Sequence, residues 1–264
     1  MAAILWLNDL PLRASILVMI GGAIALSIIG RAIAGIFYGQ QQLSLNNVIG
    51  GFKYVFISEV YAGFIGFLLF GVYDRYDAMR AEIISETSEL ASLDRFAVAF
   101  PTATRIQLRE ALKEYARQVV EVEWPQLRSR TTRMTEITAL DTLDFTYGAV
   151  EATTRKQREV LKYSLQQLGH IRDTRGNRAL RSQGALQAML WGVTLTVTAI
   201  VLIFPWMFGS PNTNATMLMA IMSSVLMASV VLVILKLSYP FSGEYGILPT
   251  PYSAFIQEVS ARGS

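Results

Sequence analysis

The chain has 264 residues, of which 52% are hydrophobic and only 16% are charged, against about 25% charged residues in an ordinary soluble domain. A net charge of +3 is too small to predict nucleic-acid binding, which needs a clustered basic face. The chain has no cysteine and one histidine, His170, which excludes disulfides, thiolate metal sites and histidine-cluster metal sites.

Four apolar runs have membrane-spanning length, close to the roughly 20 residues that cross a bilayer core. They lie at residues 14–37, 54–72, 186–208 and 217–237. Between the second and third runs, residues 74–185 hold 18 of the 23 Lys and Arg and 16 of the 20 acidic residues. The sequence therefore predicts an all-α membrane protein of four transmembrane helices, with a helical cytoplasmic domain inserted between spans two and three.

This pattern divides the chain into an N-terminal membrane half (1–73), the charged domain (74–185), a C-terminal membrane half (186–237) and a tail (238–264). The loops on the opposite side of the membrane carry only Lys53, so the positive-inside rule places the charged domain and both termini in the cytoplasm. We expect a multi-pass protein of the bacterial inner (plasma) membrane. Arg31, near the end of the first span, is expected to snorkel to the interface.

Span two continues without a proline into a charged helical pattern, so Lys53 to Arg95 is predicted to be one long helix. After the span, two sets of residues recur every seven positions and predict a coiled-coil-like seam with one acid in it. The sets are Tyr76, Ile83 and Leu90, and Met79, Glu86 and Leu93. Further helical stripes follow at residues 108–122 and, as one continuing helix, at 140–168.

Several residues from the seam onward form an ordered set of motifs. In chain order they are Glu86, Leu90, Leu93 and Arg95; Tyr115, Ala116, Glu123, Trp124, Pro125 and Leu127; Arg172, Arg175 and Arg178; and Pro240, Phe241 and Gly243. With span two, this set resembles the bestrophin-like domain family of membrane proteins, over most of the chain from about Phe52 to Glu258. Bestrophins proper are pentameric anion channels with four spans per subunit, and the resemblance implies that fold and assembly here.

In bestrophins the second span lines the axis and carries a neck of three apolar residues, the last being the Phe of a Gly-Phe pair. Gly63-Phe64 matches that pair, so the resemblance implies a neck of Phe56, Val60 and Phe64. These three share one helical face, and around a symmetry axis they would form a hydrophobic constriction that gates by dewetting. The alternative is that they only pack neighbouring helices.

Two charged residues near the predicted neck bear on selectivity. Glu59 is the only acid inside a span; it either forms a structural pair or, exposed in a ring, favours cations over anions. Lys53 either anchors the outer interface or attracts anions. Calcium-sensing bestrophins carry an acid-rich run after Pro-Phe, whereas only Glu244 follows Pro240-Phe241 here. We therefore expect no calcium site, no other metal and no cofactor.

The remaining site residues lie in the charged domain. Glu86 is expected to pair with an arginine of residues 172–181 and hold the helices in register, with a gating role as the alternative. Arg172, Arg175 and Arg178 are expected to contact anionic headgroups or the domain's own acids.

Two functions remain open at this point. The leading prediction is a homo-oligomeric, pentameric ion channel, conducting anions, whose partners are the bilayer, its own copies and inorganic ions. The alternative is a membrane-anchored scaffold or sensor that binds an unidentified protein through residues 74–185. Since no nucleophile–base set, phosphate loop or nucleic-acid motif is present, we predict neither an enzyme nor a nucleic-acid partner.

Overall fold

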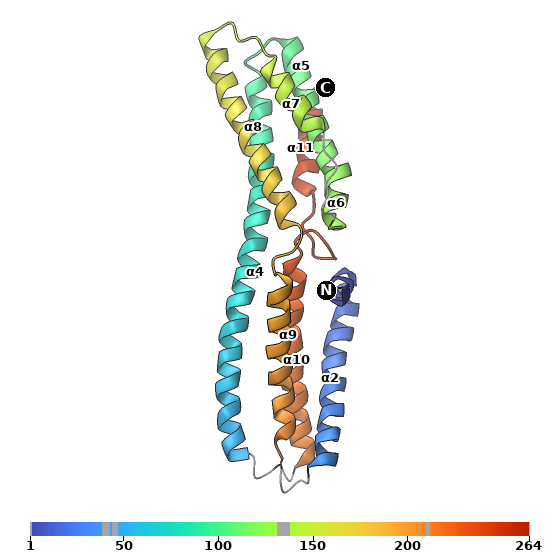
Figure 1. Ribbon diagram of the computed structural model, residues 1–264. Helices are drawn as coiled ribbons and strands as arrows, with labels where there is room; N and C mark the ends of the chain where they lie inside the picture. The colour runs from blue at the N-terminus through green and yellow to red at the C-terminus, as the bar shows by residue number, and fades with distance from the viewer. Residues whose placement is uncertain (1, 39–42, 44–46, 131–137, 210–211, 264) are drawn as a thin grey trace. The chain divides into compact units, whose positions relative to one another are not determined.

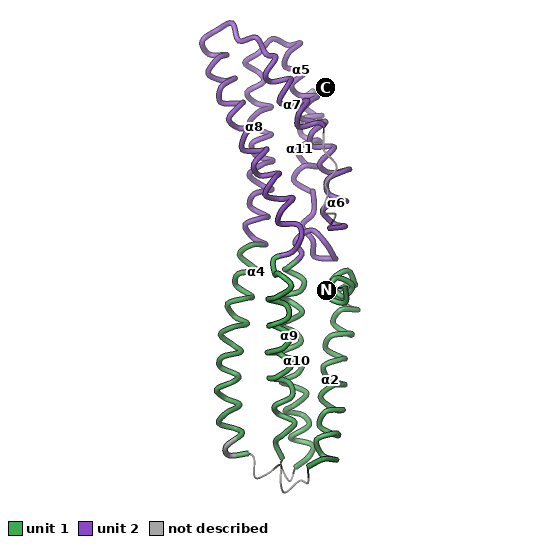
Figure 2. Tube along the Cα trace, viewed as in Figure 1, with its two compact units in different colours: residues 1–75, 185–238 green, residues 76–184, 239–264 purple. Residues whose placement is uncertain are grey.

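The computed structural model describes residues 2–38, 43, 47–130, 138–209 and 212–263, and all regular structure among them is helical. The chain forms two compact units, shown in green and purple in Figure 2. Unit 1 contains Met1–Arg75 and Ala185–Ser238, and unit 2 contains Tyr76–Gly184 and Tyr239–Ser264. Each unit is therefore built from two separate stretches of sequence.

Unit 1 is built mainly from long helices (Figure 1). They are α1 (Ala2–Asp9), α2 (Leu12–Phe37), the N-terminal part of α4 (Asn47–Ala97), α9 (Ala188–Ile203) with the short 3₁₀ turn η2 (Phe204–Met207), and α10 (Thr213–Ser238). Among the described residues, four helical segments are long and apolar enough to cross a membrane: Leu12–Phe37, Gly50–Ala97, Ala188–Met207 and Thr213–Ser238. The prediction of an all-α chain with four spans is confirmed.

Small residues let the helices of unit 1 approach closely. The hydroxyl groups of Ser27 on α2 and Ser224 on α10 are hydrogen-bonded to each other. Gly30 faces the indole of Trp206, and a Cβ at this position would overlap the ring. The neighbouring Arg31 is only 5% exposed, and its Nε has no hydrogen-bond partner among the described residues. The prediction that Arg31 snorkels is wrong, because the packed helices enclose its side chain.

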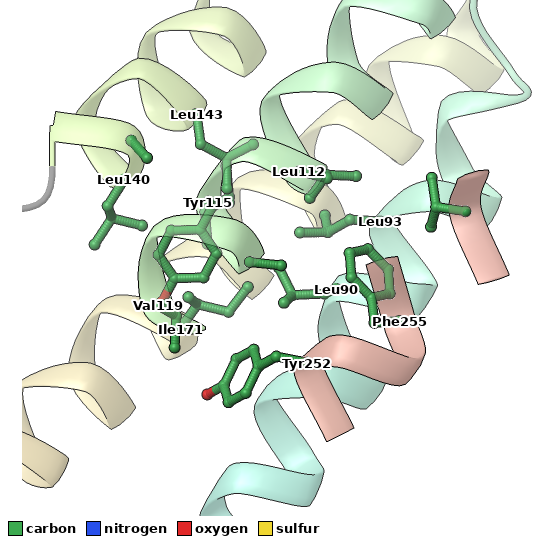
Figure 3. Close-up of a cluster of buried hydrophobic side chains, with 14 of the residues drawn as sticks. Leu90, Leu93, Leu112, Tyr115, Val119, Leu140, Leu143, Ile171, Tyr252 and Phe255 are labelled. Carbon is green, nitrogen blue, oxygen red and sulfur yellow. The ribbon is translucent and has the colours of Figure 1, made fainter. Parts of the chain in front are cut away.

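Unit 2 is a helical bundle around one apolar core. It contains the C-terminal part of α4, α5 (Thr102–Gln118), the π-helical turn η1 (Val119–Glu123), α6 (Trp124–Arg128), α7 (Thr138–Gly148), α8 (Arg155–Arg181) and α11 (Thr250–Gly263). Figure 3 shows the core, where residues from α4, α5, α7, α8 and α11 meet. The predicted seam on α4 supplies Met79, Ile83, Leu90 and Leu93, each at most 1% exposed.

Unit 2 differs from the sequence prediction at two places. The helix expected to run through residues 140–168 is two helices, because α7 ends at Gly148 and a capping box at Thr154 starts α8. Residues 239–264, set apart above as a tail, belong to unit 2. Tyr252, Phe255 and Val259 of α11 are buried in its core.

Candidate functional site

In unit 1, one face of α4 packs against the chain's own helices. Tyr61, Ile65, Leu68 and Val72 follow helical spacing, and each is at most 6% exposed. The hydroxyl of Tyr61 lies 3.2 Å from that of Thr198 on α9. This packing fixes how α4 is rotated within unit 1.

Two of the predicted neck residues, Phe56 and Val60, lie on a different side of α4, whereas Phe64 lies beside the packed face, three residues after Tyr61 and four before Leu68. Phe56 is 66% exposed and Val60 is 56% exposed, while Phe64 is half-buried. Lys53 and Glu59 are exposed, and Glu59 precedes the buried Tyr61 by two residues, about 200° around the helix. We call Phe56, Glu59 and Val60 the free face of α4. This face is open to lipid or to a second copy of the chain.

In unit 2, the other predicted residues meet in a fully buried charge cluster. Arg178 is 0% exposed, and its guanidinium donates to both Glu86 (Nη1 to Oε2, 2.5 Å) and Glu123 (Nε to Oε1, 2.7 Å). Arg175 donates from Nε to the other oxygen of Glu123 at 2.8 Å. Two carboxylates thus face two guanidinium groups, which balances the charge removed from water. Arg178 is the arginine of the 172–181 run that pairs with Glu86.

Aromatic side chains complete the charge cluster. Tyr115 donates its hydroxyl to Glu86 Oε1 at 2.8 Å, and Arg178 Nη1 donates to the hydroxyl of Tyr252 at 2.7 Å. The guanidinium carbon of Arg178 lies 5.9 Å from the ring centre of Trp124 and 5.7 Å from that of Tyr252. Both distances allow cation–π attraction. The cluster therefore joins α4, α5, η1, α6, α8 and α11.

Local backbone structure brings Glu123 to this cluster. The end of α5 widens into the π-helical turn η1, a feature that is often found at functional sites. Glu123 is the last residue of η1, and Trp124 and Pro125 begin the next helix. The indole of Trp124 donates to the carbonyl of Ile247 at 3.0 Å, which fixes the loop before α11.

Burial and neighbouring charges shift the pKa values of residues in the charge cluster. Burial raises the pKa of Tyr115 well above its usual value, and the neighbouring Glu86 carboxylate adds to this effect. Burial also raises the pKa of Tyr252, which Arg178 partly offsets. Burial acts to lower the pKa of Arg178, but Glu86, Tyr252 and Glu123 raise it well above the usual value. The arginine therefore stays charged and both tyrosines stay neutral in the folded unit.

The last predicted arginine lies outside the charge cluster. Arg172 is exposed and forms an ion pair with Asp144 on α7, so it meets the domain's own acids. Tyr252 is a cluster residue that the sequence analysis missed; its only signal was its place in an apolar stretch near Phe255. Within the described residues, no group of three or more His, Asp or Glu residues is placed to hold a metal ion.

Comparison with known proteins identifies the family. The family model of the bestrophin-like domain matches residues 21–252. The chain belongs to the bestrophin-like family. No curated protein matches it.

The bestrophin-like fold also matches solved structures of point variants of a bacterial bestrophin homologue from Klebsiella pneumoniae. One is 13% identical with a TM-score of 0.74, covering 95% of this chain and 100% of that chain. A second is 13% identical with a TM-score of 0.73, covering 95% and 99%. A third is 14% identical with a TM-score of 0.67, covering 94% and 96%. At this identity the likeness establishes the fold.

The geometry gives a physical meaning to the bestrophin-like motifs of the sequence. Glu86, Tyr115, Glu123, Trp124 and Arg178 all lie in the charge cluster. Phe241 packs edge-on against Trp124, with ring centres 5.4 Å apart. Gly243 has a φ of 79°, which favours glycine. These residues thus specify the fold of unit 2, and none of them lies on the free face of α4.

Proposed function

We propose that this bestrophin-like chain is one subunit of a homo-oligomeric, pentameric ion channel in which α4 lines the axis. One observation carries the proposal: Phe56 and Val60 are large apolar side chains left exposed on a helix whose other side is packed by Tyr61, Ile65 and Leu68. Several copies placed around an axis would cover them. The fold also matches solved structures of a bacterial bestrophin homologue, which supports a bestrophin-like channel subunit.

In this proposal Phe56, Val60 and Phe64 form a hydrophobic neck. A ring of apolar side chains blocks ions by dewetting until it widens. The phenyl groups present positive ring edges to the axis, which favours anions. Lys53 lies three residues before Phe56 and adds positive charge at the entrance, whereas Glu59 opposes anions. We place the channel in the bacterial inner membrane, with unit 2 and both termini in the cytoplasm, and assign it no catalytic step.

The test is ion flux through purified protein reconstituted in liposomes. We expect chloride flux from the wild-type protein, and a several-fold larger flux from Phe64→Ala, because the neck loses a ring of phenyl groups. The matched control is Phe37→Ala, which removes a 77% exposed phenyl group from the end of α2. It should leave flux unchanged. No flux from the wild type under any condition, or equal flux from wild type and Phe64→Ala, would contradict the proposal.

A second function is favoured by a groove between α5 and α7 in unit 2. Its volume is about 880 Å³, and its lining includes Glu110, Glu114, Glu151 and Phe145, the last 78% exposed. Such a groove suits a basic, partly apolar segment of another protein. Under this scaffold function a stoichiometric partner co-purifies with the wild type, and Phe145→Ala releases it without changing ion flux.

A further inference from the structure

A second groove in unit 2 lies beside α4. It has a volume of about 300 Å³ and lies between Tyr76, Arg80 and Ile84 of α4 and residues 246–251, the loop before α11 and its first two residues. The apolar part of its lining is open to solvent, since Ile84 is 51% exposed and Leu248 is 63% exposed. Isolated apolar side chains at a surface need no explanation, but Ile84 and Leu248 line one groove together, beside Arg80, which makes it a candidate contact.

The shape of this groove is fixed before anything binds. The amide of Ile247 donates to the carbonyl of Pro240 at 2.7 Å, and its own carbonyl accepts from Trp124 at 3.0 Å. The hydroxyl of Tyr76 donates to the carbonyl of Tyr245 at 3.2 Å. Gly246 approaches Phe241 so closely that a Cβ would lie 2.6 Å from its carbonyl oxygen. A preformed groove loses little conformational freedom on binding.

A projecting apolar side chain, Leu180, lies at the same level along α4 as the groove, on the other side of that helix. Leu180, on α8, is 76% exposed. The next residue, Arg181, pairs with Glu82 of α4 at 2.7 Å, which puts Leu180 level with the residues that line the groove. From Glu82 to Ile84 the helix turns by about 200°. The projection and the groove therefore lie on opposite sides of α4.

We propose that Leu180 of one copy of the chain fills the groove beside Ile84 and Leu248 of the next copy. A contact between two different surfaces of one chain is heterologous, and it closes into a ring when the rotation allows. If the ring axis is parallel to α4, the rotation that relates two copies does not move a residue along that axis. Leu180 of one copy then lies level with the groove of the next copy, as the contact requires. Ala81 and Ser85 are exposed on α4 between the side that faces α8 and the side that faces the groove. In the proposed ring they therefore turn toward the axis.

This inference rests on the proposed homo-oligomer and names the surfaces that join its subunits. The chain has no cysteine, so introduced cysteines report on this contact alone. We expect Leu180→Cys combined with Ile84→Cys to give, on mild oxidation in detergent, a ladder of disulfide-linked multimers on a non-reducing gel. Within one chain the two sites lie on opposite sides of α4 and cannot be linked.

The matched control is Leu180→Cys combined with Phe145→Cys, because Phe145 is equally exposed, at 78%, on α7. It should give no ladder, and neither should Leu180→Cys alone. A second measurement is native mass: Leu180→Glu should shift the oligomer toward monomer at least several-fold, whereas Ile106→Glu, at a residue of α5 that is 55% exposed, should not.

The outcomes separate the two proposals. An intact wild-type oligomer that gives no ladder and tolerates Leu180→Glu overturns this inference and leaves the proposed channel standing. Dimers from Leu180→Cys alone indicate a contact between identical surfaces and also overturn it. A wild type that is monomeric in native mass contradicts the proposed channel itself.

Discussion

The charge cluster of unit 2 depends strongly on its single residues. Arg178 and Glu123 are both 0% exposed, so their charges have left water and are compensated by each other, by Glu86 and by Arg175. Removing one member of a buried ion pair costs about 3–5 kcal/mol, because the other charge is then buried without compensation. Exposed ion pairs contribute about 0–1 kcal/mol.

We therefore expect Arg178→Met to lower the free energy of unfolding of unit 2 by about 3–5 kcal/mol. Arg172→Met, at a side chain that is 56% exposed, should lower it by less than about 1 kcal/mol. Trp124 is the only tryptophan in residues 76–184 and 239–264, so denaturant unfolding followed by tryptophan fluorescence reports on unit 2 when Trp6, Trp191 and Trp206 are replaced by Phe in every protein compared. Equal effects of the two substitutions would contradict a stabilising role for the cluster.

At the scale of elements, α8 begins at a capping box. The motif is present in the sequence, but the apolar stripe predicted over residues 140–168 did not reveal it. The backbone amide of Gln157 donates to Thr154 Oγ1 at 3.1 Å, and the amide of Thr154 donates to Gln157 Oε1 at 3.1 Å. Thr followed three residues later by Gln is the usual signature of this motif. The apolar stripe alone suggested one continuous helix, because both helices bury residues with the same period.

Thr154→Ala should destabilise unit 2 by about 1 kcal/mol through loss of this cap. Amide hydrogen exchange should quicken in the first turn of α8, at residues 155–158. Thr142→Ala serves as the control, because Thr142 is exposed inside α7, where alanine is the better helix former. Unchanged exchange in the first turn of α8 would show that the capping box does not limit fraying there.

For the whole molecule, the proposed ring gives Glu59 a role that a single chain cannot. Glu59 is exposed one residue before Val60, so in a ring one carboxylate per subunit would stand close to the neck. Carboxylate rings favour cations. The negative charge of Glu59, which disfavours anions, would then act on every permeating ion.

Glu59→Gln should raise the anion-to-cation permeability ratio by about fivefold, as expected for roughly 1 kcal/mol of Coulomb energy in water. Reversal potentials under a KCl gradient in planar bilayers measure this ratio. Glu258→Gln, on the exposed side of α11, is the control and should leave the ratio unchanged. A ratio that stays the same in both variants would remove Glu59 from the ion path.

The sequence by itself determined the four spans and the continuity of α4, because both follow from local properties: apolar length and the absence of proline from 47–97. It also predicted the buried seam through Ile83 and Leu90, since a repeat of seven residues fixes one face of a helix.

Only the tertiary structure decided which arginine meets Glu86. Arg172, Arg175 and Arg178 follow one another at three-residue spacing on one helix, and spacing cannot say which of them reaches the core. Packing against α7 leaves Arg172 at the surface, whereas α11 closes over Arg178 through Tyr252. The joining of residues 239–264 to unit 2 likewise depends on contacts far apart in sequence, which no local pattern encodes.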